Sequence, residues 1–244
     1  MQHQQKILKI YFNLELSQRQ VSQLRGAINA KIDVKKHLLF HNHLPDESFR
    51  YGYPLIQYRS YRKKALVICL GKGVEEIQHL LMRNDWHIQL GEKEVPLHIE
   101  NMKLELIPHE ITDEPSYTYR MHNWLSRTFD FQTYKHLKQE LSLLERIQLI
   151  EGKMVNNLVE YAKGVGLPLD IPIQCHLMSI DRDGEKVKEK INMAAFGFTF
   201  RTNIKLPLHI GLGKAAARGF GTIYSAEQRV FEQKRPRLQA SASC

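Results

Sequence analysis

The first patterned stretch of the chain is residues 7–13, where apolar and polar side chains alternate, which predicts a strand with one buried face formed by Leu8, Ile10 and Phe12. Ser17 stands three residues before Gln20, which is the spacing of a capping box at a helix start. Apolar residues then recur at helical spacing, at Val21, Leu24, Ile28 and Ile32. The chain is therefore expected to begin with a strand followed by a helix.

Two further apolar runs, residues 55–60 and 65–70, flank the basic turn Arg62-Lys63-Lys64 and predict a β-hairpin. A second helix is expected from Val74 to Leu81, because apolar positions again recur at helical spacing after two glycines. Strands within residues 86–107 complete the set. The order strand, helix, two strands, helix, strand is typical of a ferredoxin-like domain, in which helices cover one face of an antiparallel sheet.

Residues 108–115 are polar, begin and end with proline, and carry three acids, which is typical of a domain boundary. We therefore divide the chain into domains 1–112 and 113–244. The second half predicts a strand in 117–125, one long helix in 137–161, a hairpin of 173–180 and 188–201 about the turn 181–185, and a strand in 222–228. It follows the same pattern as the first half, without a sequence repeat.

Composition limits the class of protein. Of the 244 residues, 43% are apolar, which is enough for packed cores. No apolar run reaches the roughly 20 residues of a membrane span, and the first residues do not resemble a signal peptide, so a cytoplasmic location without membrane contact is expected. Three dispersed cysteines, Cys69, Cys175 and Cys244, indicate reduced thiols, and neither a metal nor a cofactor is expected.

The formal net charge of +9 favours a polyanionic partner. Positive charge is concentrated in residues 35–64, which hold seven Lys or Arg against two acids, and tyrosines at 51, 53, 58 and 61 lie among them. Single-stranded RNA suits such a surface, because its unstacked bases lie on aromatic rings while cations meet its phosphates. Many basic proteins bind no nucleic acid, so the clustering carries more weight than the total charge.

A glycine-rich run near the C-terminus, residues 208–223, offers a second place for phosphate. Glycines at 211, 213, 219 and 221 bracket Lys214 and Arg218, so backbone amides and two cations are expected to approach a phosphate chain closely. A nucleotide-binding loop would open a βα unit, and only about twenty residues follow Gly221. A glycine-rich hairpin linking two strands stays open as the plainer interpretation.

Three motifs in order resemble one family. They are Gly211-Leu212-Gly213-Lys214 with Arg218-Gly219-Phe220-Gly221, then His41-Asn42-His43 followed by Tyr53-Pro54-Leu55-Ile56-Gln57-Tyr58-Arg59, and the segment from Trp124-Leu125 to Tyr134. The chain resembles the CRISPR-associated repeat-RNA processing endoribonucleases of the RAMP superfamily, most closely the I-B type. The resemblance implies an α+β fold of two tandem ferredoxin-like (RRM-like) domains, with a groove between them that holds a CRISPR repeat RNA.

The resemblance also assigns the chemistry to a loop after the first helix. Histidine near neutral pH serves as either acid or base, so His41 and His43 are the expected catalytic pair for 2′-hydroxyl attack on the adjacent phosphorus. Which is the base stays open. Candidate supporting residues are Lys35, Lys36, His37, Tyr51 and Tyr53. The expected RNA-binding residues are Gly211, Gly213, Lys214, Arg218, Gly219, Phe220, Gly221, Arg59, Arg62, Lys63 and Lys64.

Other functions compete with this one. A non-catalytic RNA-binding RAMP subunit of a CRISPR effector complex would bind the repeat without cutting it. A nucleic-acid chaperone acting through charge and stacking would show steep salt dependence without preference for the repeat. A nucleotide enzyme would need a Mg²⁺-binding acidic motif, and none stands out. Effector-complex subunits and a second copy of the chain stay open as protein partners.

Overall fold

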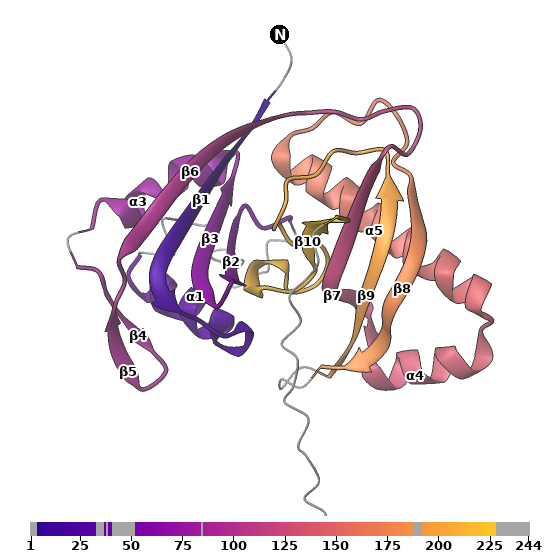
Figure 1. The fold of residues 1–244 in the computed structure, drawn as a ribbon, viewed down its shortest axis with the longest axis horizontal. Helices are drawn as coiled ribbons and strands as arrows, with labels where there is room; N and C mark the ends of the chain where they lie inside the picture. Colours follow the sequence, from indigo (N-terminus) through magenta and orange to yellow (C-terminus); the bar gives the residue numbers. More distant parts are fainter. Residues whose placement is uncertain are drawn as a thin grey trace, which may run out of the picture.

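The computed structural model describes residues 4–32, 37, 39–40, 52–83, 85–187 and 192–227. Two four-stranded antiparallel sheets form the two halves of the molecule, and the chain passes once from one to the other after β6 (Figure 1). Each sheet is covered by helices on one face. The predicted α+β architecture of two tandem ferredoxin-like domains is confirmed.

The N-terminal sheet has the order β2-β3-β1-β6, so the first strand lies centrally between the third and the last. The predicted hairpin is present, with Ile56 opposite Cys69 and Tyr61 opposite Lys64. A small separate hairpin, β4-β5, precedes the last strand. The elements are β1 (Gln4–Glu15), η1 (Gln18–Gln20), α1 (Val21–Ala30), β2 (Ile56–Tyr61), β3 (Lys64–Leu70), α2 (Lys72–Glu76), α3 (Gln78–Leu81), β4 (His87–Leu90), β5 (Lys93–Pro96) and β6 (Ile99–Pro108).

The C-terminal sheet has the order β10-β7-β9-β8, which is the same arrangement of last, first, third and second strand. The second helix of the pattern is replaced by the glycine-rich run, which contains only the 3-10 turn η2. This half is therefore a degenerate copy of the first. Its elements are β7 (Tyr117–Asp130), α4 (Phe131–Glu140), α5 (Leu143–Val165), β8 (Cys175–Lys186), β9 (Met193–Thr202), η2 (Ala216–Arg218) and β10 (Thr222–Ser225).

The single long helix predicted for residues 137–161 is wrong, because the structure has two helices there. Ser142 starts α5 with a complete capping box: its hydroxyl accepts from the Glu145 amide, and the Glu145 carboxylate accepts from the Ser142 amide. That exchange satisfies orphan amides of a new helix start, so α4 ends at Glu140. No described helix is long and apolar enough to cross a lipid bilayer.

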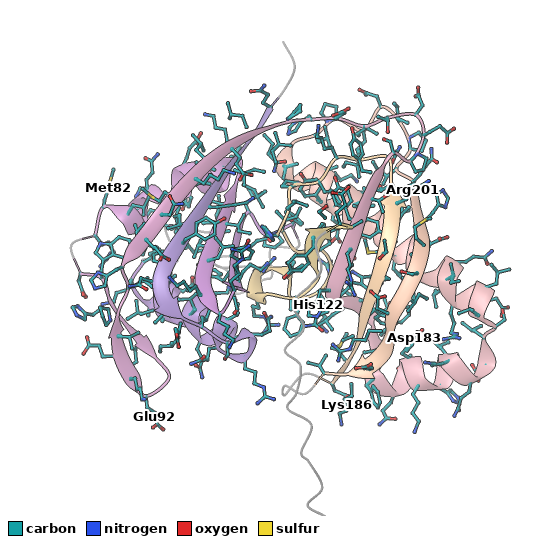
Figure 2. The ribbon with its side chains drawn as sticks, in the orientation of Figure 1. Met82, Glu92, His122, Asp183, Lys186 and Arg201 are labelled. Carbon is teal, nitrogen blue, oxygen red and sulfur yellow. The ribbon has the colours of Figure 1, made fainter. Side chains whose placement is uncertain are left out.

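The turn predicted at residues 181–185 is also wrong, because β8 runs through this polar stretch to Lys186. Asp183, labelled in Figure 2, accepts a hydrogen bond from the Tyr134 hydroxyl at 2.5 Å and pairs with Lys138 at 2.7 Å and with Arg146. These partners lie on α4 and α5, and they lower the pKa of the Asp183 carboxyl against the opposing effect of its burial. Long-range polar contacts thus hold as a strand a segment whose local composition favours a turn.

Apolar packing continues from one domain into the other. One face of the N-terminal sheet packs on α1. Ile10, Phe12 and Val67 of the sheet are buried there together with Leu24 of the helix. The opposite face contributes Ile7, Leu66, Ile68 and Leu70 to the cluster that also contains the C-terminal core. The interface between the domains is therefore part of a hydrophobic core, which stabilises one relative orientation.

Candidate functional site

The predicted histidine loop starts beside α1. Its catalytic candidates His41 and His43 lie outside the described residues, as do Lys35, Lys36 and Tyr51. The residue immediately before His41, Phe40, is buried in the N-terminal core at 2% exposure. Asn29, in the last turn of α1, donates from Nδ2 to the Phe40 carbonyl at 3.1 Å. The chain therefore enters the histidine loop from a fixed point at the C-terminal end of α1.

Tyr53, a candidate supporting residue of the catalytic loop, lies at the domain interface. Its hydroxyl donates to the Gly211 carbonyl at 2.9 Å, and its ring meets that of Tyr161 edge to face at 5.2 Å. Burial raises the pKa of this hydroxyl well above its usual range. Because the side chain is only 9% exposed, we propose that Tyr53 positions the glycine-rich run.

Arg59 holds the same run from the neighbouring strand, β2. Its guanidinium is buried, and it donates from Nε to the His209 carbonyl at 3.0 Å and from Nη1 to the Ala216 carbonyl at 2.6 Å. Nη2 donates to Gln57 Oε1 at 2.6 Å, and that oxygen also accepts from the Gly211 amide at 2.8 Å. Burial lowers the pKa of Arg59 to about 10, so it stays charged at neutral pH. With its donors on protein oxygens, we propose a structural role for Arg59 in place of RNA contact.

Close backbone approach explains glycine at two positions of the run. A Cβ at Gly211 would lie 2.2 Å from Arg59 Nη2 and 2.6 Å from the Phe220 carbonyl oxygen. At Gly221, which has a φ of +60°, a Cβ would lie 1.9 Å from the Leu212 carbonyl oxygen. Gly211, Gly219, Phe220 and Gly221 are all buried. These residues therefore shape the loop, and its outer surface belongs to other side chains.

The cations of the run, Lys214 and Arg218, are partly exposed, as sequence analysis expected of phosphate ligands. Arg218 lies near Arg25, because η2 packs against α1, and burial lowers the pKa of Arg25 with the charge of Arg218 acting in the same direction. Among the described residues, no carboxylate forms an ion pair with Arg25, Lys214 or Arg218. Like charges held together without an acid are a natural anion site.

Helix α1 connects the glycine-rich run to the start of the histidine loop. Gln18, in the turn before α1, donates from Nε2 to the Gly219 carbonyl at 2.8 Å, whereas Asn29 holds Phe40 at the other end. Eleven residues at the helical rise separate these contacts by about 16 Å. Arg25 lies between them. Arg25 lies one helical turn before Asn29, but this spacing could not mark it as a site residue, because the contact of Asn29 with Phe40 is known only from the structure.

The basic turn of the hairpin lies beside the contacting rings of Tyr61 and His209. Arg62 and Lys63 are exposed, whereas Lys64 pairs with Glu100 at 2.7 Å. Arg62 lies over the Tyr61 ring at 5.4 Å, and Tyr61 contacts the His209 ring at 4.7 Å. Burial lowers the pKa of His209 to about 4, so this imidazole is neutral at pH 7 and is a poor proton donor. Because Arg62 and Lys63 are exposed, they stay candidates for contact with RNA phosphates.

Models of known protein families match both halves of the chain and show to which family it belongs. The Cas6b N-terminal domain matches residues 3–107, and the Cas6b C-terminal domain matches residues 111–226. The chain belongs to the Cas6b family. The resemblance inferred from the histidine and glycine-rich motifs is confirmed by this Cas6b match. A search of curated proteins found no match.

Solved structures share the Cas6b fold. A crystal structure of Cas6b aligns with 91% of this chain and 100% of its own, with a TM-score of 0.77 and 21% identity. A structure described as the CRISPR RNA processing endoribonuclease Cas6b aligns over the same shares, with a TM-score of 0.63 and 19% identity. Csf5, a type IV Cas6 crRNA endonuclease, covers 91% and 99%, with a TM-score of 0.51 and 14% identity. At these identities the likeness establishes the two-domain fold.

Proposed function

We propose that this protein is an endoribonuclease that cleaves CRISPR precursor RNA within its repeats and so matures guide RNAs. Membership of the Cas6b family supports the reaction, as does the fold shared with a Cas6b described as a CRISPR RNA processing endoribonuclease. The observation that carries the proposal is the arrangement along α1. The glycine-rich run contacts the start of this helix and the histidine loop begins at its end, with Arg25 between these two contacts.

The proposed chemistry is metal-independent transesterification. One of His41 and His43 takes the proton of the 2′-hydroxyl, whose oxygen attacks the adjacent phosphorus as the bond from phosphorus to the 5′-oxygen breaks. The other histidine gives a proton to that leaving oxygen. The products are a 2′,3′-cyclic phosphate (or, after hydrolysis, a 3′-phosphate) and a 5′-hydroxyl. Arg25 and Arg218 would stabilise the charge of the RNA backbone beside this centre.

The reaction is tested by incubating a repeat RNA with the protein in EDTA and determining both new ends. Cleavage that continues in EDTA and leaves a 5′-hydroxyl, which polynucleotide kinase phosphorylates without prior phosphatase treatment, is the expected result. Dependence on added Mg²⁺, or a 5′-phosphate product, would refute the mechanism. Tight binding of the repeat without any cleavage would instead favour a non-catalytic RNA-binding subunit.

Replacing Lys214 and Arg218 together by alanine should weaken RNA binding and flatten its salt dependence. If both cations meet phosphates of single-stranded RNA, the slope of log K against log salt should fall in magnitude by about 1.4, which is two contacts at roughly 0.7 each. The measurement is fluorescence anisotropy of a 2′-deoxy repeat across a salt series. Lys135→Ala removes one exposed cation on α4, outside the proposed RNA path, and should leave the slope unchanged. An unaltered slope in the double variant would remove these residues from the RNA path.

A further inference from the structure

Three side chains that bind metal ions in proteins converge on the outer side of the N-terminal domain. Nδ1 of His37 lies 3.0 Å from a carboxylate oxygen of Glu76, and the rings of His37 and His79 have centroids 4.0 Å apart. One potential ligand atom from each residue lies within 4.8 Å of the other two. Among the described residues this is the one such group of three. Met82, labelled at the edge of the molecule in Figure 2, follows His79 by about one turn.

Local structure explains why these side chains meet. Glu76 ends α2 and His79 lies in α3, three residues later, so they project from the same side of an almost continuous helical segment. Between them Ile77 is fully buried and fixes the segment to the core. His37 belongs to a turn in which the Phe40 amide donates to the His37 carbonyl at 3.2 Å, and Phe40 is buried as well. Two anchored apolar residues thus hold the three polar side chains together.

We propose that His37, Glu76 and His79 form a binding site for a divalent transition-metal ion, with zinc as the best fit. Two imidazole nitrogens and one carboxylate oxygen are ligands that Zn²⁺ accepts, with water in the fourth position. A tetrahedral ion with bonds of about 2.1 Å needs ligand atoms about 3.4 Å apart. His37 Nδ1 and Glu76 already lie 3.0 Å apart, and we expect the exposed His79 side chain to rotate so that its nitrogen, now within 4.8 Å, reaches this spacing. The partial exposure of the group gives an ion access.

A histidine–carboxylate ion pair alone does not indicate a metal site, because the chain has two other such pairs among its described residues. His87 lies 3.6 Å from Asp85, and His136 lies 3.5 Å from Glu140, yet neither pair belongs to a group of three donors in the described part of the chain. These pairs are therefore internal controls. The sequence gives no sign of this site, because 39 residues separate His37 from Glu76 and no compact ligand motif is present.

The proposed ion has a structural role. It ties the turn that contains His37, four residues before His41, to the segment α2–α3, whose buried residues belong to the N-terminal core. The ion takes no part in the proposed transesterification. Zinc binding is thus independent of whether the protein cleaves RNA, and the two ideas fail separately.

The experiment is calorimetric titration of Zn²⁺ into untagged, chelator-stripped protein that carries Cys244→Ser, which removes an unassigned thiol. One saturable site per chain is expected. Glu76→Gln and His79→Ala should each weaken binding at least about tenfold, whereas His87→Ala should bind as the parent does. Absence of saturable binding would overturn the proposal, as would binding that both site variants retain.

Thermal unfolding gives a second measurement that does not depend on calorimetric heats. Excess Zn²⁺ should raise the melting temperature of the parent, because an ion that binds the folded state stabilises it by mass action. It should raise that of His79→Ala by clearly less, because the weakened site gains less stabilisation from the same Zn²⁺ concentration. His79 is exposed, so its replacement preserves the fold and the comparison stays interpretable. An equal rise in the parent and in His79→Ala would place the ion elsewhere and contradict the proposal.

Discussion

Replacing Arg59 by alanine is expected to destabilise the protein by roughly 3 kcal/mol or more, because buried carbonyls that lose their donors each cost about 1–3 kcal/mol. The carbonyls of His209 and Ala216 both depend on this guanidinium. For a chain of this size the melting temperature should fall by about 6–12 °C. Thermal and urea unfolding measure the change. RNA binding should weaken as well, since Arg59 holds the glycine-rich run in place.

The hydrogen bonds by which Arg59, Gln57 and Tyr53 hold the glycine-rich run are called the latch below. Two controls separate the loss of the latch from the loss of positive charge. Arg62→Ala removes a cation three residues away, from an exposed turn, and should change stability by less than about 0.5 kcal/mol. Arg59→Lys keeps the charge but lacks the planar fork of donors, so it should recover only part of the stability. If Arg59→Ala unfolded like the parent and lost only RNA affinity, Arg59 would be a direct RNA ligand and the latch would be refuted.

The combined replacement His41→Ala and His43→Ala is expected to abolish repeat cleavage without abolishing repeat binding. General acid–base catalysis contributes about 10² to 10⁴ to a rate, so the cleavage rate under single-turnover conditions should fall at least by such a factor. Affinity for a non-cleavable 2′-deoxy repeat should change little, since the cations of the path are untouched.

The single variants and one control complete that series. His41→Ala and His43→Ala should each be impaired, and opposite changes in their pH–rate profiles would separate the base from the acid. His136→Ala, an exposed histidine on α4, should cleave at the parental rate. Undiminished cleavage by the double variant would remove the acid–base role from this loop.

Much of the fold could be predicted because local pattern and tertiary structure agree. The first strand, the first helix and the basic hairpin each have apolar residues at the spacing of their element, and the structure has an element at each place. The family resemblance supported what the order of predicted elements indicated, namely that the second half copies the first. The break before α5 was present in the sequence as Ser142 and Glu145, yet the apolar period continues across it and suggested a single helix.

The latch could not be predicted, because its residues become buried only when distant parts of the chain meet. Arg59 lies among cations and tyrosines, a composition typical of an exposed RNA-binding surface. Its hydrogen-bond partner His209 is 150 residues away along the chain. Tyr53 and Gln57 likewise take their partners from the glycine-rich run. Two motifs that looked like separate RNA-binding elements therefore contact each other, and only the exposed cations beside them stay proposed RNA ligands.

The most direct test of the central claim is photo-cross-linking of a 2′-deoxy repeat RNA that carries photoreactive nucleosides near the cleavage position. We propose that the histidine loop, Arg25 and Lys214 with Arg218 lie along one RNA path. Mass spectrometry should therefore recover cross-linked peptides from residues 37–43 and from residues 214–219, at nucleotides close together in the repeat. Cross-links confined to one of these segments, with the other never touching the RNA, would contradict it.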